Sequence, residues 1–265
     1  MCFAFAHSYF LHSSFYISSS LLFYLSGKLN CSMEIRRITN PIDPAVTAFV
    51  NMQNSVYFDP DALIPAGAIR MMLSIPMTGR KNFLIVAEED GKLLGGVIFH
   101  YLKKPNVGFS SFMGTSLEAR GKGVGRKLHE ARFAALDEAA GRKVEGVFLD
   151  SVAPERLTQE ELEAERRVGS DPVVRKDVFQ HLGFRKVAIR YEQPVGGPDG
   201  GPVTNMDLLF CPHENNVDSI PTDLVVETMQ AYWMPWLGPI AAKHHAKILK
   251  TWVKGEKMLR LEALV

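Results

Sequence analysis

A run of glycines between basic residues is the strongest chemical signal in the sequence. The stretch "ARGKGVGRKL" has Gly121, Gly123 and Gly125 at every second position, with basic residues on both sides. It follows a strand-like sequence and begins a helix-like one, where the first backbone N–H groups of a helix have no partner. Glycine lets a ligand approach these donors closely, and the helix dipole favours a negative charge. We therefore expect a phosphate-binding site here.

The elements around this run predict how a sheet positions it. Residues 82–102 form two apolar stretches around Asp90-Gly91, a dipeptide typical of a tight hairpin, and residues 106–118 continue as a third strand. After the glycines, apolar residues recur at helical spacing to about Gly141, and residues 144–152 are typical of a buried strand. The crossover makes the strands before and after this helix parallel. We predict an α/β (α+β) fold with a mixed, mostly antiparallel sheet.

Composition excludes several classes of protein. The 265 residues are 46% hydrophobic and 22% charged, and the formal net charge is +1. This balance is that of a globular protein, and it gives no global attraction to nucleic acid or to a membrane, so we expect neither as a partner. Cys2, Cys31 and Cys211 are far apart and form no C-x-x-C motif. We expect no metal site and no disulfide framework, and a reducing, cytoplasmic location.

Three segments are predicted along the chain. Residues 1–32 carry no charge before Lys28 and lack the cationic start of an export signal, which favours a non-native or disordered extension over a targeting segment. Residues 33–214 form the main domain. Residues 215–265 form a helical appendage, whose tryptophans suit either packing on the domain or a homodimer contact.

A dinucleotide site is the main rival interpretation of the glycines. The fingerprint G-x-G-x-x-G needs glycine at position 126 or 128, where the chain has Arg126 and Leu128. The preceding strand also follows an antiparallel hairpin, whereas a dinucleotide fold opens with a parallel unit. A dinucleotide-binding oxidoreductase is kept as an alternative, and a phosphate loop of the G-K-[ST] type is excluded.

The segment "RGKGVG" resembles the R/Q-x-x-G-x-G/A signature of the GNAT superfamily of N-acetyltransferases. The order of elements is also similar to that family, and "FQHLGFRKV" stands where many members carry a related sequence ending in "LGF". The resemblance covers about Met33 to Phe210. It implies a GNAT fold, in which the one parallel strand pair splays apart, and an acetyltransferase that uses acetyl-CoA.

The resemblance also implies a set of binding residues. The pyrophosphate of acetyl-CoA would contact the signature, which comprises Arg120, Gly121, Lys122, Gly123, Val124, Gly125 and Arg126. The pantetheine arm would pair with the strand edge at Met113, Gly114 and Thr115. The acetyl group would then lie near Ser111, Met113 and Asp150, and would pass directly to a bound amine of a small molecule or a peptide.

Two positions differ from the family pattern. Phe179 stands where many members have a tyrosine that protonates the leaving thiolate, and Phe109 or Ser110 stands where some have a glutamate base. We expect Asp150, Ser111 and Tyr191 to act in catalysis instead, with His100 as a further candidate for proton transfer. The alternative is a non-catalytic module that only binds acyl-CoA.

Overall fold

The computed structural model describes residues 32–57, 63–195 and 200–264. The chain divides into two compact units, Met1–Ser32 and Met33–Val265, and every described helix and strand belongs to the second. The extension expected at residues 1–32 lies outside the described residues, apart from Ser32. The domain boundaries at residues 32 and 214 stay predictions.

The described strands form one nine-stranded sheet in the order β1-β2-β3-β4-β5-β7-β6-β9-β8. The strands are β1 Glu34–Ile38, β2 Arg80–Glu89, β3 Lys92–Leu102, β4 Val107–Thr115, β5 Gly146–Val152, β6 Arg185–Val187, β7 Met206–Pro212, β8 Ser219–Pro221 and β9 Met258–Glu262. In this part of the chain β4 and β5 are the one parallel pair, and the other pairs are antiparallel. The predicted mixed sheet is therefore confirmed.

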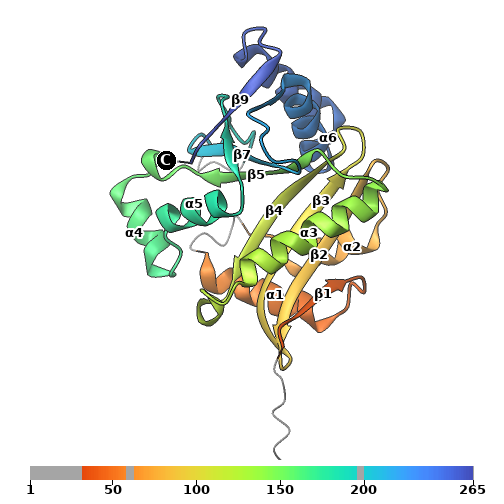
Figure 1. Ribbon diagram of the computed structural model, residues 1–265, viewed down its shortest axis with the longest axis vertical. Coiled ribbons are helices and arrows are strands. Elements are labelled where there is room, and N and C mark those ends of the chain that lie inside the picture. The colour runs from red at the N-terminus through yellow and green to blue at the C-terminus, as the bar shows by residue number, and fades with distance from the viewer. Residues whose placement is uncertain (1–31, 58–62, 196–199, 265) are drawn as a thin grey trace, which may run out of the picture. The chain divides into compact units, whose positions relative to one another are not determined.

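Helices cover both faces of the sheet. They are α1 Pro44–Val56, α2 Ala66–Ser74, α3 Val124–Ala140, α4 Gln159–Arg167, α5 Pro172–His181 and α6 Thr222–Trp252. Figure 1 shows α3 lying across β2, β3 and β4, with α1 and α2 on the far face. The core residues show the same two layers. Helices α3 and α5 pack on one face of the sheet, and α1, α2 and α6 pack on the other face.

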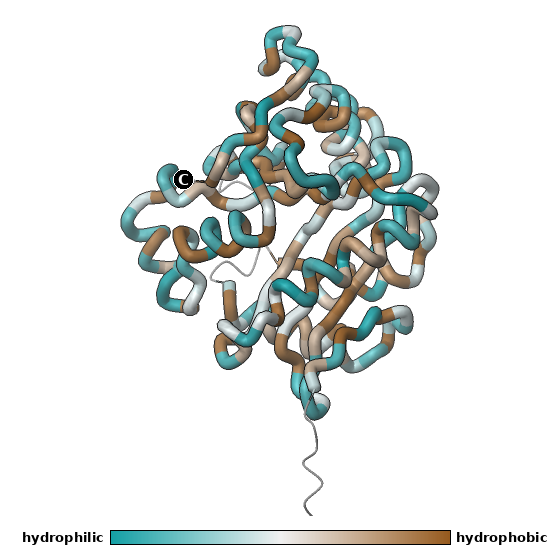
Figure 2. Tube along the Cα trace, in the orientation of Figure 1, coloured by the Kyte–Doolittle hydropathy of each residue, from teal (hydrophilic) through white to brown (hydrophobic). Residues whose placement is uncertain are grey.

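Strand alternation separates the two layers of the core. Ile85 of β2 and Val97 of β3 pack toward α3. Their sequence neighbours Leu84 and Ile98 point to the other face and pack toward Phe49 of α1. Because both faces are covered, these strands are apolar on both sides. Figure 2 shows the result, with hydrophobic chain along β2 and β3 and hydrophilic chain on the outward side of α3.

Local signals in the sequence place the helix ends. The Asp43 carboxylate accepts a hydrogen bond from the Ala45 N–H at 2.8 Å at the start of α1. Thr158 and Glu161 form a reciprocal capping box at the start of α4. Gly141 ends α3 in the left-handed conformation, with φ 68°. Each cap satisfies backbone groups that a helix end leaves without partners, so each fixes a boundary.

The C-terminal segment packs on the domain. Trp233 of α6 is 1% exposed and lies in the core layer with Phe109 and Phe148 of β4 and β5. The segment also adds β8 and β9 to the sheet, in addition to the helical structure expected for residues 215–265. Helix α6 bends at Gly238, which has φ 78° and ψ 162°. A homodimer contact remains a prediction.

Strand β6 is short and the chain turns away after it. Strand β6 ends at Val187, where the Ile189 N–H donates to the Val187 carbonyl at 2.7 Å in a tight turn. This turn interrupts the ladder with β7. The chain then bends, and the side chain of Tyr191 reaches β5.

Candidate active site

The parallel strands β4 and β5 separate after two residue pairs. Gly108 pairs with Val147 and Phe109 with Phe148, and no further pair joins them. Strand β5 continues to pair with β7 through Val152, and β4 continues to pair with β3 through Thr115. Each strand therefore has an edge that faces the other without a ladder. Backbone N–H and C=O groups on such an edge are available to a ligand that runs along it.

A bulge lies where this splay begins. Ile98 of β3 pairs with Phe112, and Phe99 pairs with Ser110, so Ser111 has no partner residue on β3. A bulge bends its strand and redirects a side chain, and bulges are frequent near active sites. The predicted site residue Ser111 thus occupies an irregular position at the beginning of the splay.

The glycine run forms an open turn at the other end of β4. Gly121 and Gly123 have φ of 77° and 75°, in the region that favours glycine, and Gly123 caps the N-terminus of α3. A Cβ atom added at Gly121, Gly123 or Gly125 would meet nothing within 4 Å. The space in front of the first N–H groups of α3 is therefore open. Backbone donors, helix dipole and space together suit a phosphate group.

The basic side chains at this turn have no acidic partners close by. Lys122, Arg126 and Lys127 are exposed, and none has a carboxylate within 4 Å in the described part of the chain. Arg120 points elsewhere, because its guanidinium donates to the carbonyl of Gly169 beyond α4. The predicted anion site therefore keeps three unneutralised cations, while Arg120 fixes the loop.

Asp150 and Tyr191 form a buried pair on the α6 side of the sheet. The Tyr191 hydroxyl donates to the Asp150 carboxylate at 2.7 Å. Burial raises the pKa of Asp150, and burial together with the Asp150 charge raises the pKa of Tyr191 well above its ordinary value. The sequence predicted both residues, and the structure brings them together although 41 residues separate them.

Ser111 belongs to a second polar cluster on the same face. Its hydroxyl lies 2.7 Å from Nε2 of His100, and Nδ1 of His100 lies 2.8 Å from Oδ1 of Asn82. Arg80 donates to the same Asn82 oxygen at 2.8 Å, and Asn82 donates its amide N–H to the carbonyl of Met72 at 2.9 Å. These partners fix which atom of the amide is the oxygen.

The direction of every hydrogen bond in this cluster follows. The Asn82 oxygen only accepts, so Nδ1 of His100 carries a proton. Burial, and then the charge of Arg80, lower the pKa of His100 well below 6.5, so the ring is neutral and Nε2 accepts. Ser111 therefore donates to His100. A hydroxyl that donates to an oriented imidazole is a group prepared for proton transfer.

Tyr232 of α6 completes the cluster and was not expected from the sequence. Its hydroxyl lies 3.3 Å from the Ser111 hydroxyl, and its ring stacks on Phe109 with centroids 3.5 Å apart. Arg80 lies over the same ring and donates to the Tyr232 carbonyl at 3.2 Å. Burial, and then the charge of Asp150, raise the pKa of Tyr232. Tyr232 thus lies in the electrostatic field of the Asp150 pair while it contacts Ser111.

No sequence signal marked Tyr232, Asn82 or Arg80. Tyr232 lies in a helical pattern outside the segment that resembles the family, and Arg80 and Asn82 are among the first, polar residues of β2, an otherwise ordinary strand. The pairing register explains Asn82, because it lies opposite His100 in the β2–β3 hairpin. That register is readable from the turn at Asp90-Gly91, but the bulge between Ala87 and Glu88 shifts it.

Phe179 lies on the other face of the sheet from these clusters. It is 9% exposed and packs edge to face on Phe184, with centroids 5.6 Å apart. Ser110, the other departure from the family pattern, accepts a hydrogen bond from Arg132 of α3 at 2.9 Å. Among the described residues, no contact joins Phe179 or Ser110 to the Asp150 pair or to the Ser111 cluster, so the sequence-predicted catalytic residues Asp150, Ser111 and Tyr191 gather on the α6 face.

Replacing Asp150 with asparagine is expected to stabilise the fold more at pH 7 than at pH 4. The folded pKa of Asp150 is raised by burial above its ordinary value of 3.8, so its charged form opposes folding. This penalty is absent below pH 3.8 and grows as the pH rises through the folded pKa. Urea unfolding at pH 7 and pH 4 measures the difference, with the exposed Asp177→Asn as control. A gain equal at both pH values contradicts this account.

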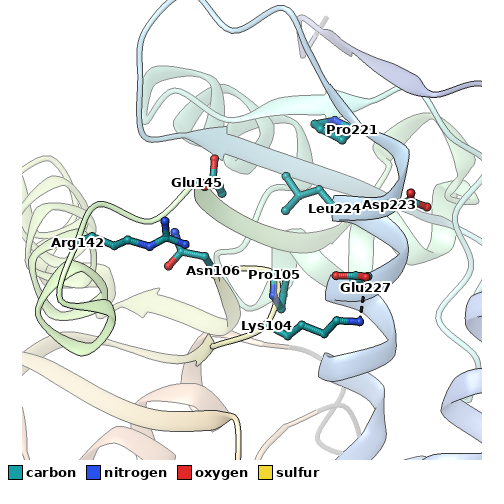
Figure 3. A pocket seen from close by; sticks show the side chains of 9 residues that line it. All are labelled: Lys104, Pro105, Asn106, Arg142, Glu145, Pro221, Asp223, Leu224 and Glu227. Carbon is teal, nitrogen blue, oxygen red and sulfur yellow. Dashed lines mark ion pairs between the residues drawn. The ribbon is translucent and has the colours of Figure 1, made fainter.

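The hollow shown in Figure 3 lies away from the splay. Its volume is about 340 Å³, and Lys104, Glu145 and Glu227 are among its lining residues. Lys104 and Glu145 precede β4 and β5, whereas the splay opens at the carboxyl ends of these strands. Lys104 and Glu227 neutralise each other in an ion pair of 2.9 Å. This hollow therefore adds nothing to the site.

The described residues contain neither a membrane-spanning helix nor a metal-binding cluster. None of their helices is both long and apolar enough to cross a membrane. No group of three or more His, Cys, Asp and Glu side chains within the same residues is arranged to hold a metal ion. His244 and His245, adjacent on α6, contact each other's rings instead.

The chain is similar to one family of known proteins in sequence and to solved structures in fold. Residues 52–158 match the sequence model of the acetyltransferase (GNAT) family. A solved structure from Bacteroides thetaiotaomicron, described as an acetyltransferase of the GNAT family, matches with TM-score 0.50 and 14% identity over 78% of this chain and 98% of that one. The Escherichia coli ribosomal-protein-S18-alanine N-acetyltransferase matches with TM-score 0.44 and 13% identity over 70% of this chain and 99% of that one. No curated protein matches the sequence.

Proposed function

Because this chain belongs to the GNAT superfamily of acetyltransferases, we propose that it transfers an acetyl group from acetyl-CoA directly to an amine of a small molecule or a peptide. The observation that carries the proposal is the splay of β4 and β5. It joins an anion site at the start of α3 to two buried clusters of proton-transfer groups.

The chain offers suitable contacts for each part of acetyl-CoA. The open turn at Gly121 to Gly125 and the unpaired Lys122 suit the pyrophosphate. At Met113, Gly114 and Thr115, the edge of β4 toward β5 forms no ladder, and it suits the amides of the pantetheine arm. When bound, acetyl-CoA supplies an activated acyl group in a thioester, so these residues need only hold and orient it.

Ser111 and His100 then serve the attacking amine. The amine loses a proton as its C–N bond forms, and the Ser111 hydroxyl accepts this proton while it passes its own to Nε2 of His100. Asn82 holds the ring so that Nε2 faces Ser111 at 2.7 Å. Backbone donors on the edge of β4 stabilise the negative charge on the carbonyl oxygen.

Tyr232 serves the leaving thiolate. As the C–S bond breaks, its hydroxyl gives a proton to the sulfur and regains one from the Ser111 relay, 3.3 Å away. Because the raised pKa of Tyr232 disfavours a free phenolate, its proton moves to the sulfur as the Ser111 relay returns one. Across the cycle one proton moves from the amine to the thiol, and the protein returns to its starting state. Tyr191 holds the Asp150 carboxylate by a hydrogen bond, and the charge of Asp150 acts on the Tyr232 hydroxyl.

Assays of the whole chain separate this function from its alternatives. We expect thiol release from acetyl-CoA when a panel of small amines and peptides is added. Tight CoA binding without turnover of any amine would support the non-catalytic acyl-CoA module instead. NAD binding without CoA binding would support the dinucleotide-binding oxidoreductase, which the single parallel strand pair of the described sheet disfavours.

A further inference from the structure

A buried arginine lies at the closed end of the splay. Arg132 of α3 is 0% exposed. Its guanidinium donates to the Ser110 hydroxyl at 2.9 Å and to Nδ1 of His129, and it lies over the Phe184 ring at 5.4 Å. The Nε–H of Arg132 has no acceptor. An unsatisfied donor on a fully buried guanidinium is unusual and calls for a partner.

None of the neighbours of Arg132 carries a negative charge. No carboxylate within the described ranges lies within 4 Å of it, whereas the partly buried Arg175 pairs with Glu165 at 2.8 Å. Burial raises the pKa of Cys211, the remaining acidic neighbour, to about 11, so its thiol is neutral at pH 7. Burial lowers the pKa of Arg132 only to about 10, so the guanidinium stays charged.

His129 cannot compensate this charge. Its Nδ1 accepts from Arg132, so its proton is on Nε2, which faces the Cys211 sulfur at 3.9 Å. Burial and the charge of Arg132 lower the pKa of His129 to about 3. The ring is therefore neutral. A lone buried cation costs several kcal/mol unless an anion joins it, so this arrangement is prepared for an anionic ligand.

The position of Arg132 identifies which part of a ligand would reach it. Ser110 directly follows Phe109, the last β4 residue paired with β5. At the other end of β4, Thr115 lies beside Val124, the first residue of α3, since both crowd the space next to Gly95. About 17 Å of extended strand separates Thr115 from Ser110. A pantetheine arm that starts at the α3 N-terminus therefore brings its acyl end to Ser110 and Arg132.

We propose, on the premise of the acyl-CoA site above, that Arg132 binds the terminal carboxylate of a short dicarboxylic acyl group such as malonyl or succinyl. The free Nε–H and a second N–H of the guanidinium match the two oxygens of a carboxylate. The transfer has the balance given above: the C–S bond breaks, the C–N bond forms, and the proton of the amine goes to the thiol. Arg132 thus sets which acyl group is transferred.

Calorimetric titration of the full chain with acetyl-CoA, malonyl-CoA and succinyl-CoA tests the proposal without a known acceptor. Hydrogen bonds to charged groups contribute about 1.5–3 kcal/mol, so we expect one dicarboxylic acyl-CoA to bind roughly 10- to 150-fold more tightly than acetyl-CoA. Arg132→Met keeps the volume and removes the charge. It should abolish this preference, whereas the surface control Arg37→Met should keep it.

The outcomes separate the two proposals. Equal affinity of the wild-type chain for all three acyl-CoAs overturns the role of Arg132 and leaves the acetyltransferase proposal intact. A preference that persists in Arg132→Met assigns the carboxylate to another residue and also overturns it. If Arg132→Met does not fold, the wild-type comparison alone decides. Absence of binding by every CoA ester overturns the acyl-CoA site itself.

Discussion

Replacing Gly125 with glutamate is expected to weaken CoA binding by roughly 5- to 1,000-fold. The new carboxylate would stand in the open space before the first N–H groups of α3, where the pyrophosphate is proposed to bind. Repulsion between unit charges about 4 Å apart amounts to about 1–4 kcal/mol near a protein surface, which gives this range. Calorimetric titration with CoA measures the loss.

The choice of Gly125 makes this test specific. Unlike Gly121 and Gly123, it does not have a positive φ, so a side chain there does not strain the backbone. Gly125→Ala adds only a Cβ atom with nothing within 4 Å and should bind CoA nearly as well as the wild type. Gly67→Glu makes the same change of charge at an open position of α2. Retained affinity in Gly125→Glu would refute the pyrophosphate site.

Replacing Ser111 with alanine is expected to lower kcat by roughly 100- to 10,000-fold, the range for loss of a general acid or base. The change removes the hydroxyl between Tyr232 and His100 and so interrupts the proposed proton path. Affinity for CoA should be unchanged, because Ser111 serves proton transfer and not the pyrophosphate. Steady-state kinetics with any amine that the wild type acetylates, together with CoA titration, gives both values.

Tyr232→Phe tests the same path at its other end. Loss of the hydroxyl removes the proposed proton donor of the thiolate, so kcat should fall. Because Tyr232 and Ser111 act in one relay, the double variant should lose less than the product of the two single losses. Tyr101→Phe is the matched control, because this buried tyrosine lies on the opposite face of the sheet, where its hydroxyl bonds Asn106. Ser74→Ala is the control for serine. A fall in kcat for Ser111→Ala but not for Tyr232→Phe would assign thiol protonation to another group.

Much of the proposed acetyl-CoA site could be predicted from the sequence, because its features are local. The alternation of glycine and basic residues in one segment predicts an open, positively charged helix start, and the structure has such a start at Gly123. The Asp90-Gly91 turn, the Asp43 cap and the Thr158 capping box each depend on residues within four positions of one another. Short-range hydrogen bonds and allowed φ angles determine such features, and both are encoded in adjacent residues.

The polar clusters beside the splay could be identified only from the tertiary structure. Ser111, His100 and Tyr232 meet because a β-bulge shifts β4 against β3 and because α6, more than 100 residues further on, packs on Phe109. The charge on Arg132 is likewise ordinary in the sequence, and only the fold shows that it is buried without an acid. Burial, hydrogen-bond partners and pKa follow from the packing of distant segments. The sequence by itself determined the glycine-rich signature and the central strands β2 to β5. Tertiary packing decided which polar side chains meet on the α6 face and which buried charge lacks an acidic partner among the described residues.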